Sequence, residues 1–435
     1  ARRLRGGRSR ESAACRAGGP LMSQRAAVDL LIIGADAAGF AAAACAAKSG
    51  ASVALAPTGG EAPAAGSASE PPNFIWRLLD LHLHDLQSGP AAPQTTLLEK
   101  GALSTSADPM RTGEALAARD PALEHLWPAF AADMKRAPAG RAPEAADRFL
   151  SANALLDDYF ADEDLKTHLV SAFVAPFGLA GDEMGSAAAL AGAGEMAHAR
   201  ISAKALFDAL HDAATKAGVD CLSGRLQTLV RVDAKNWKTV MDNGHEARGR
   251  MAMASSVLLG EAAGLRVSCN GSPLVRRIGA EAIIRIRYDK RPSAAALRAT
   301  SDFFTATDRA AILRARNAMI DGRIGDEPVL RFEVSGKEII ARAPYCAARL
   351  RENGDEREWT GQDRQILGRQ AAALIEKRLG GGLGAVREIE VTIGADAATG
   401  LKRRSFDVPA IPAPAPSHDP IGAAAALALE IVRDE

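Results

Sequence analysis

The sequence predicts an α/β protein, in which a parallel sheet is built from separated segments of the chain and an α+β region is inserted between them. Three observations indicate this class. An apolar run at Val28–Ile33 ends at a glycine, as strands buried on both faces do. A helix of small residues at Ala37–Lys48 and a strand at Ser52–Ala56 complete a strand–helix–strand unit, whose crossover should be right-handed. A later apolar run, Val257–Leu259, follows a helix and several short strands and suits the same sheet.

The composition is that of a folded protein without a large charged surface. At roughly 150 residues per domain, a chain of 435 residues suggests two or three structural units. Hydrophobic residues make up 47% and charged residues 24%, which is ordinary for a globular chain. The 53 basic and 53 acidic residues cancel, so the basic footprint of a nucleic-acid-binding protein is missing. Five cysteines without a Cys-x-x-Cys pair exclude a disulfide framework and favour a reducing compartment.

Residues 1–25 are basic and lack the apolar run of a secretory signal, so we expect a disordered extension there. Residues 1–21 are either an organellar transit peptide or a stretch upstream of a true start at Met22, and the second interpretation is favoured. The most apolar stretch, Val28–Ala47, contains two aspartates and two glycines, which argues against a membrane span. We therefore expect a cytoplasmic protein, or an organellar one if residues 1–21 are a transit peptide.

The predicted helices are marked by apolar spacing and by the residues at their ends. The best defined is Ser202–Ala217, which has a serine as N-cap and apolar residues four apart on one face. Pro57–Pro72 and Pro409–Pro416 are loops or extended segments by composition. Further helical segments are expected at Asn73–Gln87, 109–149, Ala152–Val170, Asp363–Leu379 and Ile421–Val432.

Short predicted strands belong to two different sheets. Ser335-Gly336 joins Leu330–Val334 and Glu338–Ala341 as a hairpin. Together with Ala282–Tyr288, which alternates apolar and other residues, this hairpin predicts an antiparallel sheet apart from the parallel one. A turn at Asn243-Gly244 marks the other group of strands. The remaining predicted strands are Val219–Leu222, Leu226–Val232, Lys238–Met241 and Val391–Ile393.

One motif between the first strand and its helix carries chemistry: Gly34-Ala35-Asp36-Ala37-Ala38-Gly39. In this context G-x-G-x-x-G binds a dinucleotide, because its glycines permit a tight turn, close approach of the pyrophosphate and helix packing. The first and third glycines are kept, and Asp36 replaces the second. Pro57 stands where an acid, about 20 residues further on, would bind the ribose.

Asp36 places a carboxylate where the phosphate oxygens of a dinucleotide would lie. Two unit charges about 4 Å apart, at an effective dielectric near 20, repel by about 4 kcal/mol, which is an upper limit for this effect. The carboxylate can turn outward, become protonated or be offset by an arginine. The alternative interpretation is a strand–helix–strand unit that has lost its ligand.

The order of the later elements adds a second signal. Between Ser202 and Gly260 the sequence predicts a helix, short strands with a turn and a returning strand, and Ser417–Gly422 leads into a last Ala-rich helix. This order resembles the flavoprotein family of phytoene desaturases and related amine-oxidase-like enzymes, over about residues 26–260 and more loosely over 385–432. The family commonly ends with a segment that touches the flavin, followed by a helix.

The resemblance implies a Rossmann-type FAD/NAD(P)-binding domain built from separated segments, with FAD as cofactor and an inserted α+β substrate or cap domain. Its implied segments are an extension at 1–25, a Rossmann unit at 26–72, a mainly helical cap at 73–200, a returning segment at 201–262, an α+β cap at 263–384 and a C-terminal segment at 385–435. The implied cofactor-binding residues are Gly34, Ala35, Asp36, Ala38, Gly39, Ala56, Leu226, Leu259, Gly260, Ile421 and Gly422.

The sequence departs from the family pattern at Asp36 and Pro57. It also has no arginine next to Gly59-Gly60 and no recognisable apolar strand ending in Gly-Asp before the last helix. The implied function is a FAD-dependent oxidoreductase that removes hydride from an apolar or amphipathic small molecule. The cofactor carries such chemistry, so we name no catalytic residue. The alternative is a non-catalytic homologue that keeps the fold as an interaction scaffold.

Other chemistry-bearing residues are interpreted as structural. His82 and His84 lie two apart on a predicted helix and face different sides, so a surface helix is favoured and no metal site is predicted. Cys346 has no histidine beside it in sequence and is interpreted as a buried free cysteine rather than a nucleophile. His418-Asp419 either contacts a flavin, as the family resemblance implies, or belongs to a Pro-rich linker, which is favoured.

Overall fold

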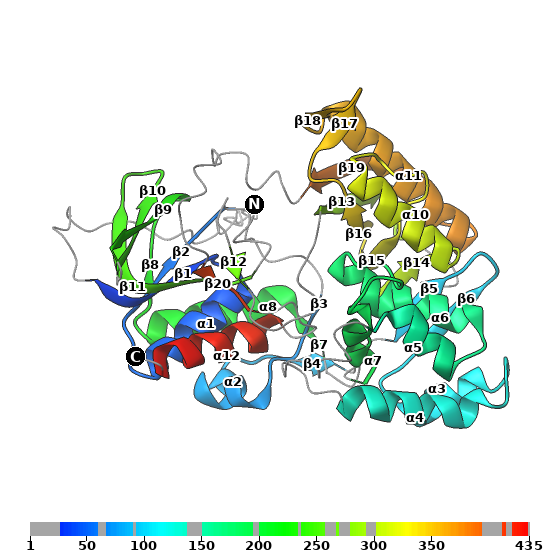
Figure 1. Cartoon of the computed structure of the whole chain (residues 1–435), viewed down its shortest axis with the longest axis horizontal. Coiled ribbons are helices and arrows are strands. Elements are labelled where there is room, and N and C mark those ends of the chain that lie inside the picture. Colours follow the sequence, from blue (N-terminus) through cyan, green and yellow to red (C-terminus); the bar gives the residue numbers. More distant parts are fainter. Residues whose placement is uncertain are drawn as a thin grey trace, which may run out of the picture.

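The computed structural model contains two large sheets, each with its own helices and its own apolar core (Figure 1). One sheet has six strands and the other has seven. The predicted fold class, α/β with an inserted α+β region, is confirmed. The structure describes residues 27–59, 67–89, 93–136, 150–194, 200–233, 236–256, 267–268, 279–292, 302–393, 411–414 and 420–433.

The six-stranded sheet has the order β8-β2-β1-β11-β10-β9. Its first four strands are parallel to one another, and β10 and β9 continue it antiparallel. Four-residue apolar runs in β1 and β2 are wholly buried, as the sequence predicts for strands covered on both faces. The strands are β1 (Val28–Ile33), β2 (Val53–Ala56), β8 (Asp220–Cys221), β9 (Leu226–Asp233), β10 (Asn236–Met241) and β11 (Glu246–Ala254).

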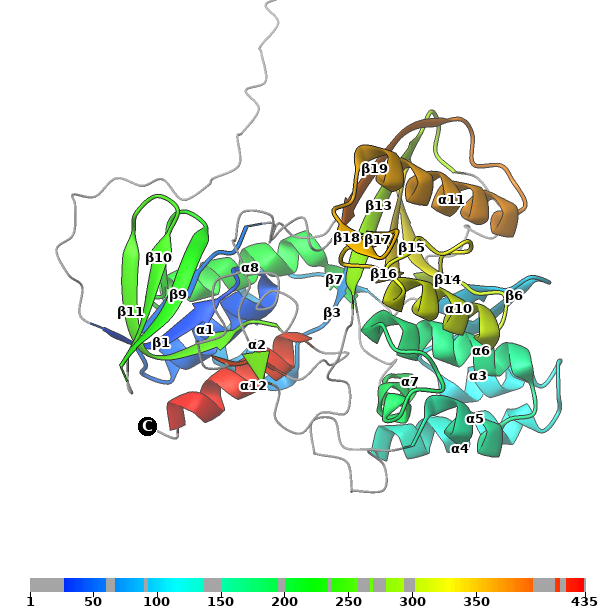
Figure 2. The same ribbon diagram turned by 45° about the horizontal axis from the view of Figure 1, so that its top comes forward.

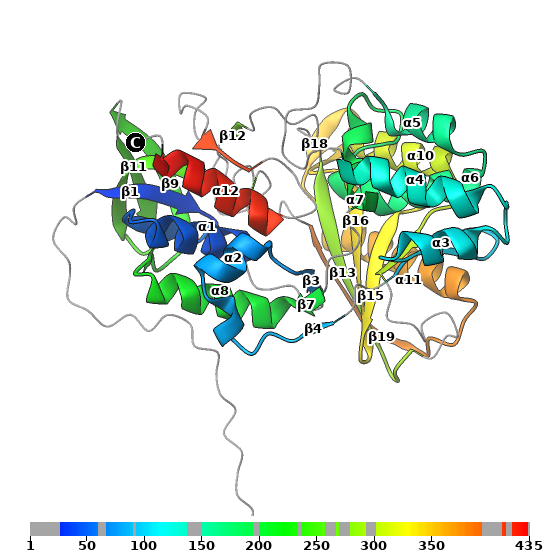
Figure 3. The same ribbon diagram turned by 90° about the horizontal axis from the view of Figure 1, so that it is seen from below.

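Three helices cover one face of this sheet and lie side by side in all three ribbon views (Figures 1–3): α1 (Ala37–Lys48), α8 (Ala203–Lys216) and α12 (Pro420–Arg433). The middle helix, α1, is made almost wholly of small residues, eight of which are buried together with Phe40. Small side chains allow α12 to lie close to it. The C-terminal segment of the chain is therefore packed against its first helix.

The antiparallel strands fold over the other face of β1. Leu226, Trp237 and Met241 share an apolar cluster with Leu31 and other residues of β1 and β2. Strand β11 bends at Gly249, which pairs with β10 on one side and with β1 on the other. A Cβ at Gly249 would lie 2.5 Å from Leu31 Cγ, so only glycine allows this close approach.

The seven-stranded sheet has the order β19-β13-β16-β15-β14-β5-β6 and is antiparallel except for the pair β14–β5. It contains Ala282–Tyr288, Leu330–Val334 and Glu338–Ala341, which confirms the prediction of a separate antiparallel sheet. Its strands are β5 (Gln94–Leu97), β6 (Ala102–Thr105), β13 (Ala280–Tyr288), β14 (Asp302–Thr305), β15 (Leu330–Ser335), β16 (Glu338–Cys346) and β19 (Val386–Ile393).

Helices of two groups pack on the seven-stranded sheet. Helix α11 (Gly361–Leu379) begins with a capping box formed by Thr360 and Asp363 and shares a core with β13 and β16. Helix α10 (Arg309–Ile320) and the helices before residue 195 share a second core, in which Trp127, Phe130 and Phe160 cluster. These helices are α3 (Pro109–Leu116), α4 (Leu123–Arg136), α5 (Ala152–Tyr159), α6 (Glu163–Leu169) and α7 (Ala191–Gly194), with a π-helical turn at Val170–Val174 and 3₁₀ turns at Ala175–Phe177 and Ser186–Leu190.

Smaller elements complete the described chain. A three-stranded sheet of β3 (Ser67–Ser69), β7 (Arg200–Ser202) and β4 (Ser88–Gly89) lies between the two large sheets (Figure 3). The other elements are α2 (Asn73–Leu78), a 3₁₀ turn at Leu81–Leu83, the pair β12 (Val267–Ser268) and β20 (Ile411–Pro412), and the pair β17 (Leu350–Glu352) and β18 (Asp355–Arg357). None of the described helices is both long enough and apolar enough to span a bilayer.

The structure corrects two predictions. The segment Asn73–Gln87 is not one helix, because α2 ends at Leu78. The loop predicted at Pro57–Pro72 contains strand β3. The region 73–200, predicted to be mainly helical, also contributes β5 and β6 to the seven-stranded sheet. The strand that pairs with β1 in the described chain is β11, whereas the predicted strand Val257–Leu259 lies outside the described residues.

Candidate functional site

The topology of the six-stranded sheet marks the end of β1 as the place where open sheets of this kind have their ligand crevice. From β1 the chain passes through α1 to β2 on one side, whereas the strand on the other side, β11, comes from much later in the sequence. The strand order therefore reverses at β1. In open parallel sheets, ligands bind outside the carboxyl ends of the strands at such a switch point. The residues that follow β1, β2 and β11 form the candidate site.

The turn after β1 needs glycine at two places. Gly34 has a φ of +110°, and its N–H donates to the carbonyl of Ala56 at the end of β2, 2.9 Å away. A Cβ built on Gly39 would overlap the carbonyl oxygen of Gly34. The two glycines that the fingerprint retains are thus explained by the turn and by the packing of α1 on it. Ala38, also predicted at this site, is buried.

Asp36 is the N-cap of α1. Its Oδ1 accepts the N–H of Gly39 at 2.8 Å, and its carbonyl accepts the N–H of Phe40 at 2.9 Å. The carboxylate is therefore folded back onto its own helix. It takes one of the free N–H groups with which a helix N-terminus binds anions. The negative charge that a phosphate would bring is already partly supplied by the protein.

The end of β2 has no acidic side chain. Ala56 is fully buried, and the residues that follow it are Pro57, Thr58 and Gly59. The carbonyl of Pro57 accepts the N–H of Leu226, 2.7 Å away, at the start of β9. This bond places Leu226, a predicted cofactor-binding residue, beside the end of β2, and its side chain is buried. The structure brings these two distant segments together.

Arg225 was not predicted as a site residue, yet it lies directly against Gly59. A Cβ at Gly59 would overlap Arg225 Nε and lie 2.8 Å from Cζ. The sequence shows no arginine next to Gly59-Gly60, but the fold supplies one from 166 residues further along the chain. No local pattern marks Arg225, because its position depends on how β9 returns to β2.

The end of β11 and the start of α12 complete the site. The N–H of Ser255 donates to the carbonyl of Ile33 at 2.8 Å, which holds Ser255 beside the end of β1. Ser255 is fully buried, and among the described residues its hydroxyl has no hydrogen-bond partner. Ile421 and Gly422 are buried in the first turn of α12, which packs on α1. Of the predicted site residues, Leu259 and Gly260 lie outside the described residues, as does His418-Asp419.

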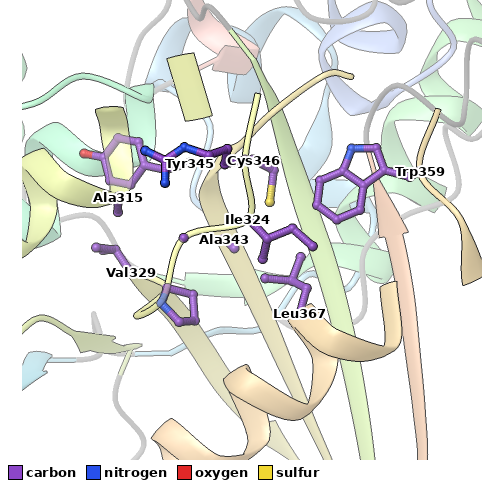
Figure 4. Close-up of a pocket in the computed structure, with 11 residues that line it drawn as sticks. Ala315, Ile324, Val329, Ala343, Tyr345, Cys346, Trp359 and Leu367 are labelled. Atoms are coloured by element: carbon purple, nitrogen blue, oxygen red, sulfur yellow. The ribbon is translucent and has the colours of Figure 1, made fainter. Parts of the chain in front are cut away.

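The other predicted candidates are structural. His84 lies 3.6 Å from Asp212, His82 is exposed, and the described residues contain no group of side chains suited to a metal ion. Cys346 is buried, and burial raises the pKa of its thiol to about 12, which makes it a poor nucleophile. Figure 4 shows Cys346 and Trp359 at a small cavity under β16.

That cavity and a second one beside Phe304 have volumes of about 10 and 20 Å³, room for roughly one water molecule each. Both are lined by residues of the seven-stranded sheet and its helices. Neither holds an apolar substrate. A larger cavity shared with the six-stranded sheet stays a prediction.

The buried histidine His168, which contacts the seven-stranded sheet, also has a structural role. His168 is fully buried on α6, with Thr96 Oγ1 2.7 Å from its Nδ1 and Thr105 Oγ1 2.8 Å from its Nε2. Burial lowers the pKa of His168 to about 3, so the ring is neutral at physiological pH. Both ring nitrogens are occupied by threonines of β5 and β6, which leaves no atom for a substrate.

The crevice fits an adenine dinucleotide through its backbone and opposes one through two side chains. Gly34, the N-terminus of α1 and the unpartnered Ser255 hydroxyl are suited to a polar, anionic ligand. The Asp36 carboxylate competes for the same helix N-terminus. Pro57 offers no side-chain acceptor to a ribose hydroxyl. Arg225 supplies a positive charge beside Gly59, close to the end of β2.

Comparisons with known proteins add the fold. No family model and no curated sequence matches this chain. Solved structures do match: putrescine oxidase bound to putrescine (TM-score 0.54, 12% identity, covering 94% of this chain and 99% of that one) and cyclohexylamine oxidase from Brevibacterium oxydans IH-35A (0.51, 14%, 94% and 99%). RAB GDI from Plasmodium falciparum matches equally well (0.54, 10%, 94% and 98%). The chain has the fold of these proteins. At such low identities the likeness shows the fold alone.

Proposed function

We propose that this chain is a FAD-dependent oxidoreductase that removes hydride from an apolar or amphipathic small molecule. The observation that carries the proposal is the crevice at the switch point, which is assembled from the segments after β1, β2 and β11 and from α12. Two of the structural neighbours are named as oxidases of amines, which supports the same class of chemistry. The assignment of residues 26–72 and 201–262 to the cofactor domain remains part of this proposal. The predicted C-terminal segment 385–435 is corrected, because β19 (Val386–Ile393) belongs to the seven-stranded sheet.

Named residues would hold the cofactor. The turn at Gly34 and the first N–H groups of α1 would face its pyrophosphate, and Ser255 and Gly422 would border the crevice. Bound flavin supplies the capacity to accept hydride. The chain itself binds and orients the groups at the crevice and keeps the sheet behind them dry, since Ile33 and Ala56 are fully buried.

The test is the visible spectrum of the purified protein. A yellow protein with bound-flavin absorbance, or one that takes up added FAD with a change in flavin fluorescence, supports the proposal. A folded protein that stays colourless and leaves added FAD free contradicts it. Folding is checked in the same sample by thermal unfolding.

A second function is favoured by one observation, the bond between Asp36 and the Gly39 N–H. A helix N-terminus that is capped by its own carboxylate is stable without a ligand. The second candidate is therefore a non-catalytic protein that keeps this fold as an interaction scaffold. The colourless outcome above is the result it predicts.

A further inference from the structure

Arg225 is held in one place by its main chain. Its N–H donates to Asp242 Oδ1 and its carbonyl accepts the N–H of Asp242, both at 2.8 Å. The next residue, Leu226, donates to the carbonyl of Pro57 at 2.7 Å. These three bonds tie the start of β9 both to the turn after β10 and to the end of β2. The position of the Arg225 main chain therefore follows from the fold, and its exposed side chain starts beside the end of β2.

The guanidinium lies on the glycine that follows β2. Gly59 has a φ of +89°, and a Cβ there would overlap Arg225 Nε. Glycine is required for both the backbone conformation and the contact. The guanidinium thus lies against the backbone at Gly59, at the carboxyl edge of the parallel sheet. This edge binds ligands in this class of fold.

Among the described residues, no carboxylate is paired with the Arg225 guanidinium. The Asp242 carboxylate accepts a hydrogen bond from the Arg225 main chain and forms no ion pair with its guanidinium. Residues 56–59 contain no acid, because proline stands where an acid would bind a ribose. An arginine in this place instead accommodates a phosphate, since its planar fork matches phosphate oxygens.

We propose that Arg225 binds a phosphate of an adenine nucleotide at the carboxyl ends of β1 and β2. The inference rests on the nucleotide crevice of the proposed function, but it does not require that the nucleotide be FAD. Two phosphates qualify chemically: the diphosphate on the 5′ carbon, or a phosphate on the ribose 2′ carbon. Both would accept charge-assisted hydrogen bonds from the guanidinium.

The experiment titrates wild type, Arg225→Ala, Arg225→Lys and Arg248→Ala with 5′-AMP, ADP and 2′,5′-ADP by calorimetry. Arg248 is the matched control, because it is an exposed arginine without a described ion pair near the opposite end of β11. We expect Arg225→Ala to lower the affinity for either ADP or 2′,5′-ADP about tenfold to a hundredfold, which corresponds to about one charge-assisted bond. Arg225→Lys restores part of this loss, and Arg248→Ala changes nothing.

The probes separate the two phosphates. Preference for ADP over AMP that is lost in Arg225→Ala assigns the arginine to the 5′-diphosphate. Preference for 2′,5′-ADP that is lost in the same variant assigns it to the ribose phosphate. In both cases, added salt weakens binding to wild type more than to Arg225→Ala. Failure of all three nucleotides to bind wild type, or equal binding by wild type and Arg225→Ala, overturns the inference.

Titration with FAD keeps the two proposals distinguishable. If FAD does not bind but an Arg225-dependent nucleotide does, the flavin function fails and the assignment of Arg225 stands. If FAD binds wild type and Arg225→Ala equally, and no nucleotide depends on the arginine, the assignment fails and the flavin function stands. Thermal unfolding of Arg225→Ala, which keeps its main-chain bonds, checks that the fold is intact.

Discussion

Replacing Asp36 tests whether the crevice is closed to a dinucleotide by its own carboxylate. Two variants separate the charge from the cap. Asp36→Asn keeps an oxygen that can accept the Gly39 N–H and removes only the charge. Asp36→Gly removes the charge and the side chain together and frees the N–H for a ligand. We expect FAD to bind more tightly to both variants than to wild type, and most tightly to Asp36→Gly.

The magnitude follows from the position of the carboxylate. Its repulsion of a phosphate about 4 Å away reaches about 4 kcal/mol at an effective dielectric near 20. Asp36 is only half-buried, so solvent and salt leave about 1–2 kcal/mol of this. That corresponds to an affinity gain of about fivefold to thirtyfold. Loss of the cap acts on folding instead and lowers the stability of Asp36→Gly by a few tenths of a kcal/mol.

The assay is a titration of each protein with FAD, followed by flavin fluorescence, with the urea unfolding midpoint as the check on folding. Weaker binding by Asp36→Asn would refute the reasoning, because the carboxylate would then have a favourable role, through a cation or a different ligand. If wild type and both variants leave FAD unbound, the obstacle lies elsewhere in the crevice. The scaffold function is then the better one.

Three further predictions concern neighbouring and structural residues. Pro57→Glu in the Asp36→Gly background should tighten FAD binding by a smaller factor, up to roughly 1.5 kcal/mol from a ribose hydrogen bond, in the same titration; an unchanged affinity contradicts it. Gly39→Ala should destabilise the protein by about 3 kcal/mol in urea unfolding, since its Cβ overlaps the preceding turn, whereas Gly361→Ala, with open space around it, should be neutral or slightly stabilising. His168 is neutral in the folded protein, with a pKa of about 3 against about 6.5 in the unfolded chain, so the unfolded state binds the extra proton and the free energy of unfolding falls by about 2 kcal/mol from pH 7 to pH 5. His168→Gln should remove that part of the fall, as measured by urea unfolding at the two pH values. If the fall is the same in the variant, His168 is not its cause.

The first strand–helix–strand unit was predictable because its signals are local. The apolar run of β1 and the small residues of α1 gave the structure's own limits, Val28–Ile33 and Ala37–Lys48. Buried strands and capped helices depend on adjacent residues, which a sequence displays directly. The Ser202 N-cap of α8 was found for the same reason, and its Oγ accepts the N–H of Ala205.

The other elements could not be predicted from adjacent residues, because strand pairing between distant segments determines them. Strand β11 contains Gly249, two methionines and two alanines in its second half, a composition with weak strand preference, and it is a strand because β1 offers a free edge. The membership of β5 and β6 in the second sheet depends on the parallel pairing of β5 with β14, more than 200 residues later. Arg225 was missed on the same ground, since its contact with Gly59 exists only after β9 returns to β2.

The two departures from the dinucleotide fingerprint, Asp36 and Pro57, have one combined effect on the charges around the crevice. In the usual arrangement the helix N-terminus is left free for the pyrophosphate and the end of the second strand carries an acid. Here the acid, Asp36, lies at the helix N-terminus, and the end of β2 carries no acid but faces the arginine Arg225.

The charges at the two positions are therefore exchanged relative to the usual arrangement. An anionic ligand is therefore repelled near α1 and attracted near β2, about one strand spacing away. A nucleotide bound in this crevice would place its phosphates nearer to Gly59 than the fingerprint implies. On this view the loss of the second glycine weakens binding of an ordinary dinucleotide without removing the site's preference for phosphate.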